Sequence, residues 1–236
     1  MNILLFSNEE LGPEGRVKVS GRRYRHIKQI LNAQTGDPLR AGIVGGKMGE
    51  AKVIGYQGEA VELSFVPHMN PPKPLPLKIV MALPRPKVLK RVLSNVVSLG
   101  VKEIYLINAF RVEKPYWSSE QVTPDYIRRA CLLGLEQARD TILPQIVLSR
   151  LFKPFVQDHL PAIIKGTRAF VGHPGVEQTV PHGIIEPITL VIGPEGGFIP
   201  YEIQLLKEAG VEPVTLGERV LKVETAITYL AGRFMS

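Results

Sequence analysis

The sequence predicts an α/β protein with two domains, a small β domain over residues 1–70 and a larger α/β domain over residues 71–236. Short strand-like runs separated by glycine fill the first part, as in a small barrel. The stretch "HMNPPKPLPLK" (68–78) then carries four prolines, which preclude regular helix and suit an extended linker. After it, apolar runs alternate with helical patterns, which implies a parallel sheet covered by helices on both faces.

In the first domain the expected strands are "PLRAGIVG", "GEAKVIGYQ" and "EAVELSF". The segment "YRHIKQILNAQTG" has helical spacing, with Ile27, Ile30 and Leu31 on one side and Gly36 beyond its end. The string "GIVGGKMG" (42–49) lacks the first glycine and the Ser or Thr of a phosphate-binding P-loop, so we expect a hairpin tip there.

In the second domain six apolar runs are expected strands: "LKIVMAL", "EIYLINAF", "QIVLS", "TRAFVG", "ITLVIG" and "EPVTLG". The helix after the first run has one apolar stripe, formed by Val88, Leu89, Val92, Leu93 and Val96. Another helix opens at Thr123 and Pro124 and places Cys131 in the core. Further helices are expected at 152–164, 200–209 and 224–235.

Composition excludes several classes of protein. Cys131 is the only cysteine, which rules out an internal disulfide and a multi-cysteine zinc site. The five histidines show no metal-ligand spacing, so no metal is expected. No apolar run approaches the roughly 20 residues that span a bilayer, and "MNILLFSNEE" does not read as a signal peptide. The expected location is the cytoplasm.

The net charge of +7 favours a polyanionic partner. Positive side chains gather in "RVKVSGRRYRHIK" (16–28), which contains no acid, and in "RPKVLKR" (85–91). The alternative is that both clusters are solvated faces without a partner.

Three glycine-containing loops each follow an expected strand: "FVGHPG" (170–175), "VIGPEGGF" (191–198) and "LGERVLKVETA" (216–226). Ligands of open α/β sheets bind at the carboxyl ends of strands, and glycine allows a close approach to the backbone. The loops carry few cations and no G-x-G-x-x-G fingerprint is present, which favours an adenosine-type cofactor over a triphosphate or a dinucleotide.

The strings "IGPEGGF…E" (192–202) and "LGERVLKVETA" (216–226) resemble the signature of the bacterial 16S ribosomal RNA uridine-N3 methyltransferases, of the SPOUT or trefoil-knot superfamily. "RHIKQIL", "SLGVKEIYLINAFRVEKPYW" (98–117) and "EQARDTILPQI" (136–146) extend the resemblance over nearly the whole chain. It implies a PUA-like β-barrel that helps to hold RNA, a knotted α/β domain, S-adenosylmethionine bent in that knot, and a homodimer with the site beside the interface. The implied cofactor-binding residues are Gly172, His173, Gly193, Glu195, Gly196, Gly197, Leu216, Gly217, Val220 and Leu221.

The chain departs from the family pattern at several positions. Lys222 and Val223 stand where the family commonly has Arg and Thr, and lysine lacks the planar fork of arginine. Ile199 stands where Ser or Thr is frequent, which removes a side-chain N-cap that Pro200 partly replaces. "QILNAQ" lacks an arginine that usually follows the histidine.

N3 of uridine carries a proton that must leave before it can attack the activated methyl group. We expect Glu224 to be the base, or else a carboxylate in the first turn of the last helix that the helix dipole stabilises. We expect Arg219 and Lys222 to hold the nucleotide's phosphate or to stabilise a uracil oxygen. The expected substrate is 16S ribosomal RNA, naked or in the assembled small subunit. The expected RNA contacts are Arg22, Arg23, Arg25, Lys28, Arg85, Lys87, Lys90 and Arg91.

Three other functions compete with this one. A related SPOUT enzyme would methylate a ribose 2′-hydroxyl or another base. A non-catalytic RNA-binding or ribosome-assembly factor would keep the fold, although the intact glycine loops count against a lost cofactor. A kinase or NTPase is disfavoured by the failed P-loop.

Overall fold

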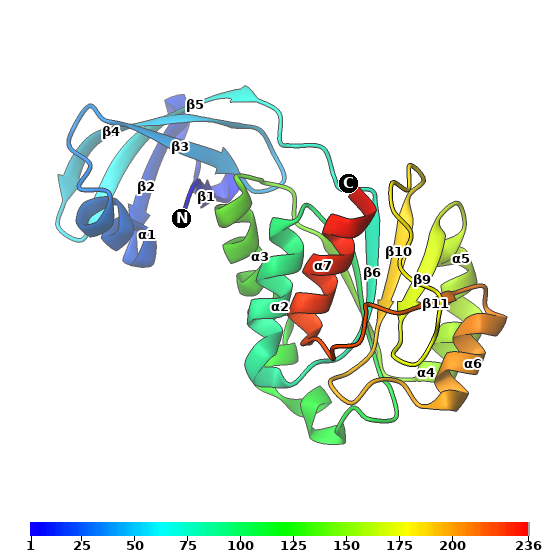
Figure 1. Cartoon of the computed structure of the whole chain (residues 1–236). Coiled ribbons are helices and arrows are strands. Elements are labelled where there is room, and N and C mark those ends of the chain that lie inside the picture. Colours follow the sequence, from blue (N-terminus) through cyan, green and yellow to red (C-terminus); the bar gives the residue numbers. More distant parts are fainter. Residues whose placement is uncertain (236) are drawn as a thin grey trace. The chain divides into compact units, whose positions relative to one another are not determined.

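The structure is a computed structural model that describes residues 1–235, and Figure 1 traces its elements along the chain. The chain forms two compact units. The first comprises Met1–Lys73 together with Leu132–Leu143, and the second comprises Pro74–Cys131 and the chain from Pro144 onward. The units are described separately below.

The first unit is built on a five-stranded sheet in the order β1-β3-β4-β5-β2. The strands are β1 (Leu4–Phe6), β2 (Arg16–Ser20), β3 (Pro38–Ile43), β4 (Met48–Gln57) and β5 (Ala60–Met69). β1 pairs with β3 in parallel and the other neighbours are antiparallel. The three predicted strands are confirmed as β3, β4 and β5, and the turn between β3 and β4 is the predicted hairpin tip.

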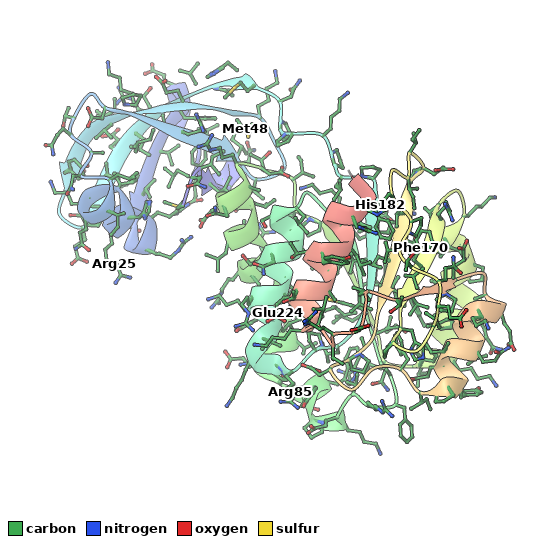
Figure 2. The ribbon with its side chains drawn as sticks, viewed as in Figure 1. Arg25, Met48, Arg85, Phe170, His182 and Glu224 are labelled. Carbon is green, nitrogen blue, oxygen red and sulfur yellow. The ribbon has the colours of Figure 1, made fainter. Side chains whose placement is uncertain are left out.

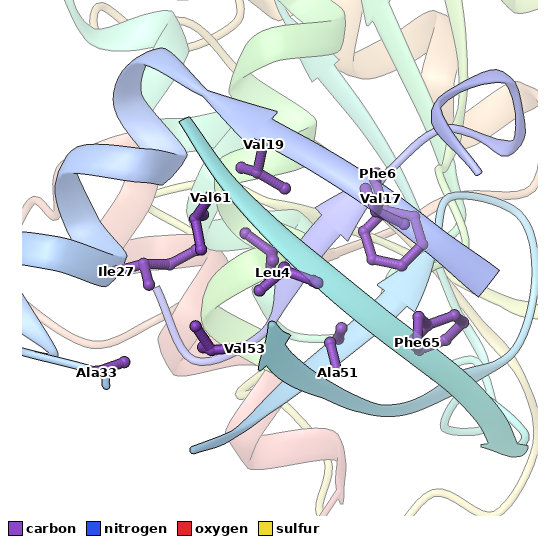
Figure 3. Close-up of a cluster of buried hydrophobic side chains, with 12 residues drawn as sticks. Leu4, Phe6, Val17, Val19, Ile27, Ala33, Ala51, Val53, Val61 and Phe65 are labelled. Atoms are coloured by element: carbon purple, nitrogen blue, oxygen red, sulfur yellow. The ribbon is translucent and has the colours of Figure 1, made fainter. Parts of the chain in front are cut away.

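The core of this unit lies against one face of the sheet (Figure 3). In β2, Val17 and Val19 are buried while their neighbours are exposed, the alternation expected of a strand with one face on a core. Phe6 and Phe65 meet edge to face with ring centroids 4.9 Å apart. This apolar cluster holds the sheet to the helical segment that follows β2, because Ile27 is part of it.

That helical segment consists of α1 (Gly21–Arg25) and a π-helical turn over His26–Ile30. Of the three side chains predicted to share a side, Ile27 is buried but Ile30 and Leu31 are 68% and 48% exposed. The π turn explains the difference: the Leu31 N–H bonds the His26 carbonyl five residues back, and this wider turn moves both side chains off the buried stripe.

The second unit contains a six-stranded sheet in the order β11-β9-β10-β6-β7-β8, in which all neighbouring strands are parallel. Each of the six predicted runs is confirmed as a strand. They are β6 (Leu77–Ala82), β7 (Glu103–Ile107), β8 (Gln145–Ser149), β9 (Arg168–Gly172), β10 (Ile188–Ile192) and β11 (Glu212–Val214). β10 is buried along its whole length, as expected of a central strand covered on both faces.

The helices of this unit follow the sequence pattern closely. They are α2 (Pro86–Ser98), α3 (Pro124–Ala138), α4 (Phe152–Pro154), α5 (Leu160–Ile164), α6 (Pro200–Glu208) and α7 (Val223–Met235). A π-helical turn joins α4 to α5, so the predicted segment 152–164 is helical throughout. Figure 1 shows α2 beside α7 on one side of the sheet, with α5 and α6 on the other.

The predicted stripe of α2 is buried at Leu89, Val92, Leu93 and Val96. Cys131 on α3 is 2% exposed, and burial raises the pKa of its thiol to about 12, so it is a core residue as predicted. Among the described residues, none of the helices has the length and apolar character needed to cross a bilayer.

The proline-rich linker corresponds to residues 70–76, between the end of β5 and the start of β6. The sequence did not predict that the second half of α3 and the loop after it would join the first unit. There the Glu136 carbonyl accepts the N–H groups of Asn2 and Ile3 at 2.8 and 3.2 Å, and the Glu136 carboxylate binds Arg22. The Thr141 hydroxyl donates to the Gly46 carbonyl at 2.6 Å.

Candidate functional site

The three predicted loops meet at the carboxyl edge of the parallel sheet and enclose a cavity of about 350 Å³. The loop after β9 contributes Gly172 and Pro174, and the loop after β10 contributes the segment from Ile192 to Gly197. The loop after β11 and the start of α7 complete the lining with Thr215, Leu216, Gly217, Arg219, Val220, Leu221, Val223 and Ala226. The cavity lies wholly within the second unit.

All the residues that the sequence assigned to a cofactor line this cavity, except His173. The His173 backbone N–H donates to the Val214 carbonyl at 3.0 Å, which links the end of β9 to the end of β11. Burial lowers the pKa of its imidazole below the usual range.

The glycines allow the loops to lie close to one another. A Cβ on Gly193 would lie 3.2 Å from the backbone nitrogen of Phe198, and one on Gly172 would lie 3.0 Å from Cδ1 of Leu216. Gly197 and Gly217 have φ values of +72° and +105°, which residues with a side chain adopt at a cost. A Cβ on either would meet no atom within 4 Å, so these two glycines border open space.

The sequence analysis missed the apolar floor of the cavity. Ile192 ends β10, Val223 and Ala226 lie in the first turn of α7, and each lines the cavity. Pro194 and Thr215 also line it. Their places at a strand end or in a helix's first turn are the signal that could have identified them, because such positions face the same edge of the sheet.

Glu195 has a structural contact. Its carboxylate Oε1 accepts the backbone N–H of Arg85 at 3.2 Å, at the start of α2. Next to it, the guanidinium of Arg111 donates to the Gly196 carbonyl. Hydrogen bonds to the segments that follow β6 and β7 therefore hold the loop after β10 in place.

Glu202 is a buried carboxylate that the sequence analysis did not single out. It is 3% exposed, and it accepts the N–H groups of Phe110 at 2.7 Å and of Ile199 at 3.0 Å. The bond to Ile199 is the acidic half of a capping box. It accounts for the tolerance of isoleucine at this helix start, where the sequence lacks a hydroxyl cap.

Of the three predicted catalytic residues, Arg219 lines the cavity, while Lys222 and Glu224 do not. Glu224 lies in the first turn of α7 (Figure 2), where its carboxylate accepts a hydrogen bond from the guanidinium of Arg91 at 2.6 Å. Its own backbone N–H, and next the hydrogen bond from Arg91, hold the pKa of this carboxyl below the usual range.

The predicted RNA-binding cations fall into two groups. Three are bound to acids: Arg22 to Glu136, Arg23 to Glu10 and Arg91 to Glu224. The others are exposed, although Lys28 Nζ lies 4.3 Å from the centroid of the Tyr56 ring. Figure 2 shows Arg25 on the surface of the first unit.

In the part of the chain that the structure describes, no group of three or more His, Cys, Asp or Glu side chains is arranged to hold a metal ion.

The chain matches known proteins over most of its length. Residues 71–235 match the family model of the RNA methyltransferase domain. A protein of Treponema pallidum (strain Nichols), the ribosomal RNA small subunit methyltransferase E, is 30% identical, with 96% of this chain and 87% of that protein covered.

Two solved structures have the same fold. One is a methyltransferase of Legionella pneumophila in complex with the cofactor SAM, with a TM-score of 0.74 and 22% identity over 98% of this chain and 94% of that one. The other is the ribosomal RNA small subunit methyltransferase E of Neisseria gonorrhoeae bound to S-adenosyl methionine, with a TM-score of 0.73 and 20% identity over 97% and 96%. These likenesses confirm the predicted two-part fold, an α/β domain with a parallel sheet preceded by a small β domain. With the glycine-lined cavity, the family model and the Treponema relative all in agreement, the chain belongs to the RNA methyltransferase domain family and, within it, to the ribosomal RNA small subunit methyltransferases E.

Proposed function

We propose that this protein transfers a methyl group from S-adenosylmethionine to N3 of a uridine in 16S ribosomal RNA. The observation that carries the proposal is the cavity at the carboxyl edge of the parallel sheet, whose walls are the three glycine-containing loops. Two of these loops, 191–198 and 216–226, contain the strings that resemble the family signature. The Treponema relative is named for methylation of small-subunit RNA, and the Legionella and Neisseria structures contain the cofactor.

The lining of the cavity fits that cofactor. Ile192, Leu216, Leu221 and Ala226 supply apolar surface for an adenine ring. Gly193, Gly196, Gly197 and Gly217 carry no side chain, so the polar parts of the molecule can approach the backbone closely there. When bound, S-adenosylmethionine supplies the electrophilic methyl group.

Arg219 is the catalytic residue in this proposal, because its side chain lies on the wall of the cavity. As the N3 proton leaves, negative charge develops on the uracil oxygens, and a guanidinium beside them stabilises it. Lys222 is exposed three residues further on and provides a second positive charge in the same loop.

For Glu224 we propose a positioning role in place of the base role that the sequence alone suggests. A base works best when its pKa is near the operating pH. The pKa of the Glu224 carboxyl is instead lowered below the usual range for a carboxyl, further from neutral pH. Its carboxylate is bound to Arg91 and lies off the cavity lining, so it ties α7 to α2.

The RNA-binding surface in this proposal consists of the exposed cations that have no acid partner among the described residues. From the set predicted to bind RNA, these are Arg25 and Lys28 in the first unit and Arg85, Lys87 and Lys90 in the second. We propose that the first unit, built mainly from residues 1–70, is a PUA-like domain that holds RNA, and that the second unit, built from most of residues 71–236, is the methyltransferase domain. The family resemblance further supports a homodimer and the cytoplasm as the place of action.

The test is nucleoside analysis of small-subunit RNA after incubation with the purified protein and methyl-labelled cofactor. Naked 16S ribosomal RNA and assembled small subunits are compared as substrates. We expect the label in 3-methyluridine. Label on a ribose or a purine would refute the N3 assignment, and absence of cofactor binding by calorimetry would support a non-catalytic assembly factor instead.

A further inference from the structure

Phe110 is a large apolar side chain that the fold leaves in solvent. It is 76% exposed, although most other large apolar residues of the second unit are buried. It lies three residues after the end of β7, on the same edge of the sheet as the loops that line the cavity. The methyl-transfer site as described so far makes no use of it.

The backbone at Phe110 is firmly held. Its N–H donates to the buried carboxylate of Glu202 at 2.7 Å, and the same carboxylate accepts the N–H of Ile199 at 3.0 Å. A buried carboxylate that accepts two backbone N–H groups fixes both segments, because losing it would leave two donors unpaired. The position of Phe110 is thus coupled to the loop that forms one wall of the cavity.

The residue after Phe110 contacts that wall directly. Arg111 donates to the Gly196 carbonyl, and its Cδ would lie 2.9 Å from a Cβ placed on Gly196. Gly196 lines the cavity. The backbone that carries the exposed Phe110 ring is therefore held one residue away from a direct contact with the rim of the proposed methyl-transfer site.

The charges around Phe110 fit RNA better than protein. Arg85, Arg111 and Lys114 are exposed at or near this rim. The neighbouring acids, Glu113 and Glu195, accept hydrogen bonds from the Tyr116 hydroxyl and the Arg85 N–H. An aromatic ring beside exposed cations is the arrangement that holds single-stranded nucleic acid, because the cations contact phosphates while a base stacks on the ring.

We propose that Phe110 is a stacking platform for a base of the RNA substrate at the mouth of the cavity. This inference rests on the proposed function and deepens it. A uridine inside a helix is not accessible to a methyl donor, so the target must be unstacked from its neighbours. Phe110 replaces part of the stacking that is lost, and Glu202 is the residue that positions it.

The test measures RNA binding, which does not depend on turnover. Wild type, Phe110→Leu and Phe110→Trp are titrated with 16S ribosomal RNA and with assembled small subunits. Phe110→Leu keeps an apolar side chain but lacks the aromatic face, and we expect affinity to fall about five- to hundred-fold. Phe110→Trp should bind like wild type, and its added fluorescence, above that of Trp117, should be quenched by RNA.

The matched control is Ile185→Ala. Ile185 is 94% exposed and precedes β10, at the opposite edge of the sheet, so its removal should leave RNA affinity unchanged.

Unchanged cofactor affinity in Phe110→Leu, measured by calorimetry, would show that the cavity is intact. The proposal is overturned if Phe110→Leu binds RNA as wild type does, or if Phe110→Trp binds RNA without quenching. A change in self-association with no change in RNA affinity would also overturn it, because the residue would then belong to a protein interface. If wild type binds RNA but does not methylate it, the proposed function fails, while the comparison at Phe110 still gives its own result.

Discussion

The guanidinium of Arg91 on α2 donates a hydrogen bond to the carboxylate of Glu224 on α7 at 2.6 Å. The two residues lie 133 positions apart in the chain. The side chain of Glu224 is 16% exposed and that of Arg91 is 57% exposed. The pair therefore has one end near solvent, and its net contribution to stability is about 0.2–1 kcal/mol.

Replacing Glu224 by Gln separates a positioning role from a base role. Loss of a general base lowers turnover by about 10²- to 10⁴-fold. We expect less than about a tenfold loss in kcat, because glutamine can still accept a hydrogen bond from Arg91. Single-turnover methylation measures the effect, with Arg91→Gln as the matched variant. A loss of a thousandfold in Glu224→Gln alone would restore the base assignment.

Gly193→Ala is expected to weaken cofactor binding at least tenfold. Its Cβ would press on the Phe198 nitrogen at 3.2 Å and on the Gly197 Cα at 3.3 Å, so the loop that lines the cavity must shift. Gly232→Ala is the control, because its Cβ would meet nothing within 4 Å in the exposed part of α7. There we expect a stabilisation of about 0.5–1 kcal/mol. Calorimetric titration and thermal unfolding of both variants check the prediction, which fails if they bind cofactor equally.

Glu202→Ala should both destabilise the protein and loosen the cavity. The N–H groups of Phe110 and Ile199 would lose their acceptor, at a cost of about 1–3 kcal/mol for each group that stays buried and unpaired. Glu208→Ala, an exposed change at the end of the same helix, should have an effect within about 0.5 kcal/mol. Urea unfolding compares the two, and equal midpoints would contradict the structural role of Glu202.

Glu10 gives a prediction about acid pH. The hydrogen bond from Arg23 is the largest cause that lowers the pKa of its carboxyl below the usual value, which is about 4.3 in an unfolded chain. A carboxyl whose pKa is lower in the folded state stabilises the protein above that range and loses this contribution as pH falls through the folded value. Glu10→Gln should therefore be less stable than wild type at pH 7, and the difference should shrink below about pH 4. Urea unfolding at pH 7 and pH 3.5 measures it; a difference independent of pH would rule out the linkage.

Two arginines of the first unit should differ in their effect on RNA affinity. Arg25 is exposed, whereas Arg22 is bound to Glu136, whose side chain is 5% exposed. Arg25→Ala should reduce the slope of log affinity against log salt by about 0.7–0.9, which is one phosphate contact. Arg22→Ala should instead lower stability, because a nearly buried carboxylate loses its partner. Equal slopes in both variants and wild type would show that neither arginine contacts phosphate.

The parallel sheet was predictable because apolar residues dominate most of its strands, as in β10 from Ile188 to Ile192. The loop around Gly193 was predictable because three glycines within residues 193–197 indicate a special backbone, and the loop around Gly217 was predictable because its glycine directly follows an apolar run. Ile30 and Leu31 were predicted beside Ile27, but a π turn cannot be read from apolar spacing, since that spacing assumes 3.6 residues per turn.

Long-range ion pairs were not predictable for a different reason. The segment 16–28 contains no acid, so Arg22 and Arg23 looked like parts of one uniform basic surface. Their partners, Glu136 and Glu10, come from other parts of the chain. In the same way Glu224 was the natural base in its loop until the fold brought Arg91 to it. Charge along a sequence describes neighbours in the chain, whereas pKa depends on neighbours in space.

The segment Leu132–Leu143 makes the small β domain a discontinuous one. Residues 1–70 alone would lack the Glu136 groups that bind Arg22 and the N–H groups of Asn2 and Ile3, just before β1. They would also lack the Thr141 carbonyl that accepts the Gly45 N–H at 2.8 Å. Cutting the chain at the proline linker therefore does not release a self-sufficient module. A fragment meant to study this domain must restore the 132–143 segment, and any exchange of the domain between relatives must carry both pieces together.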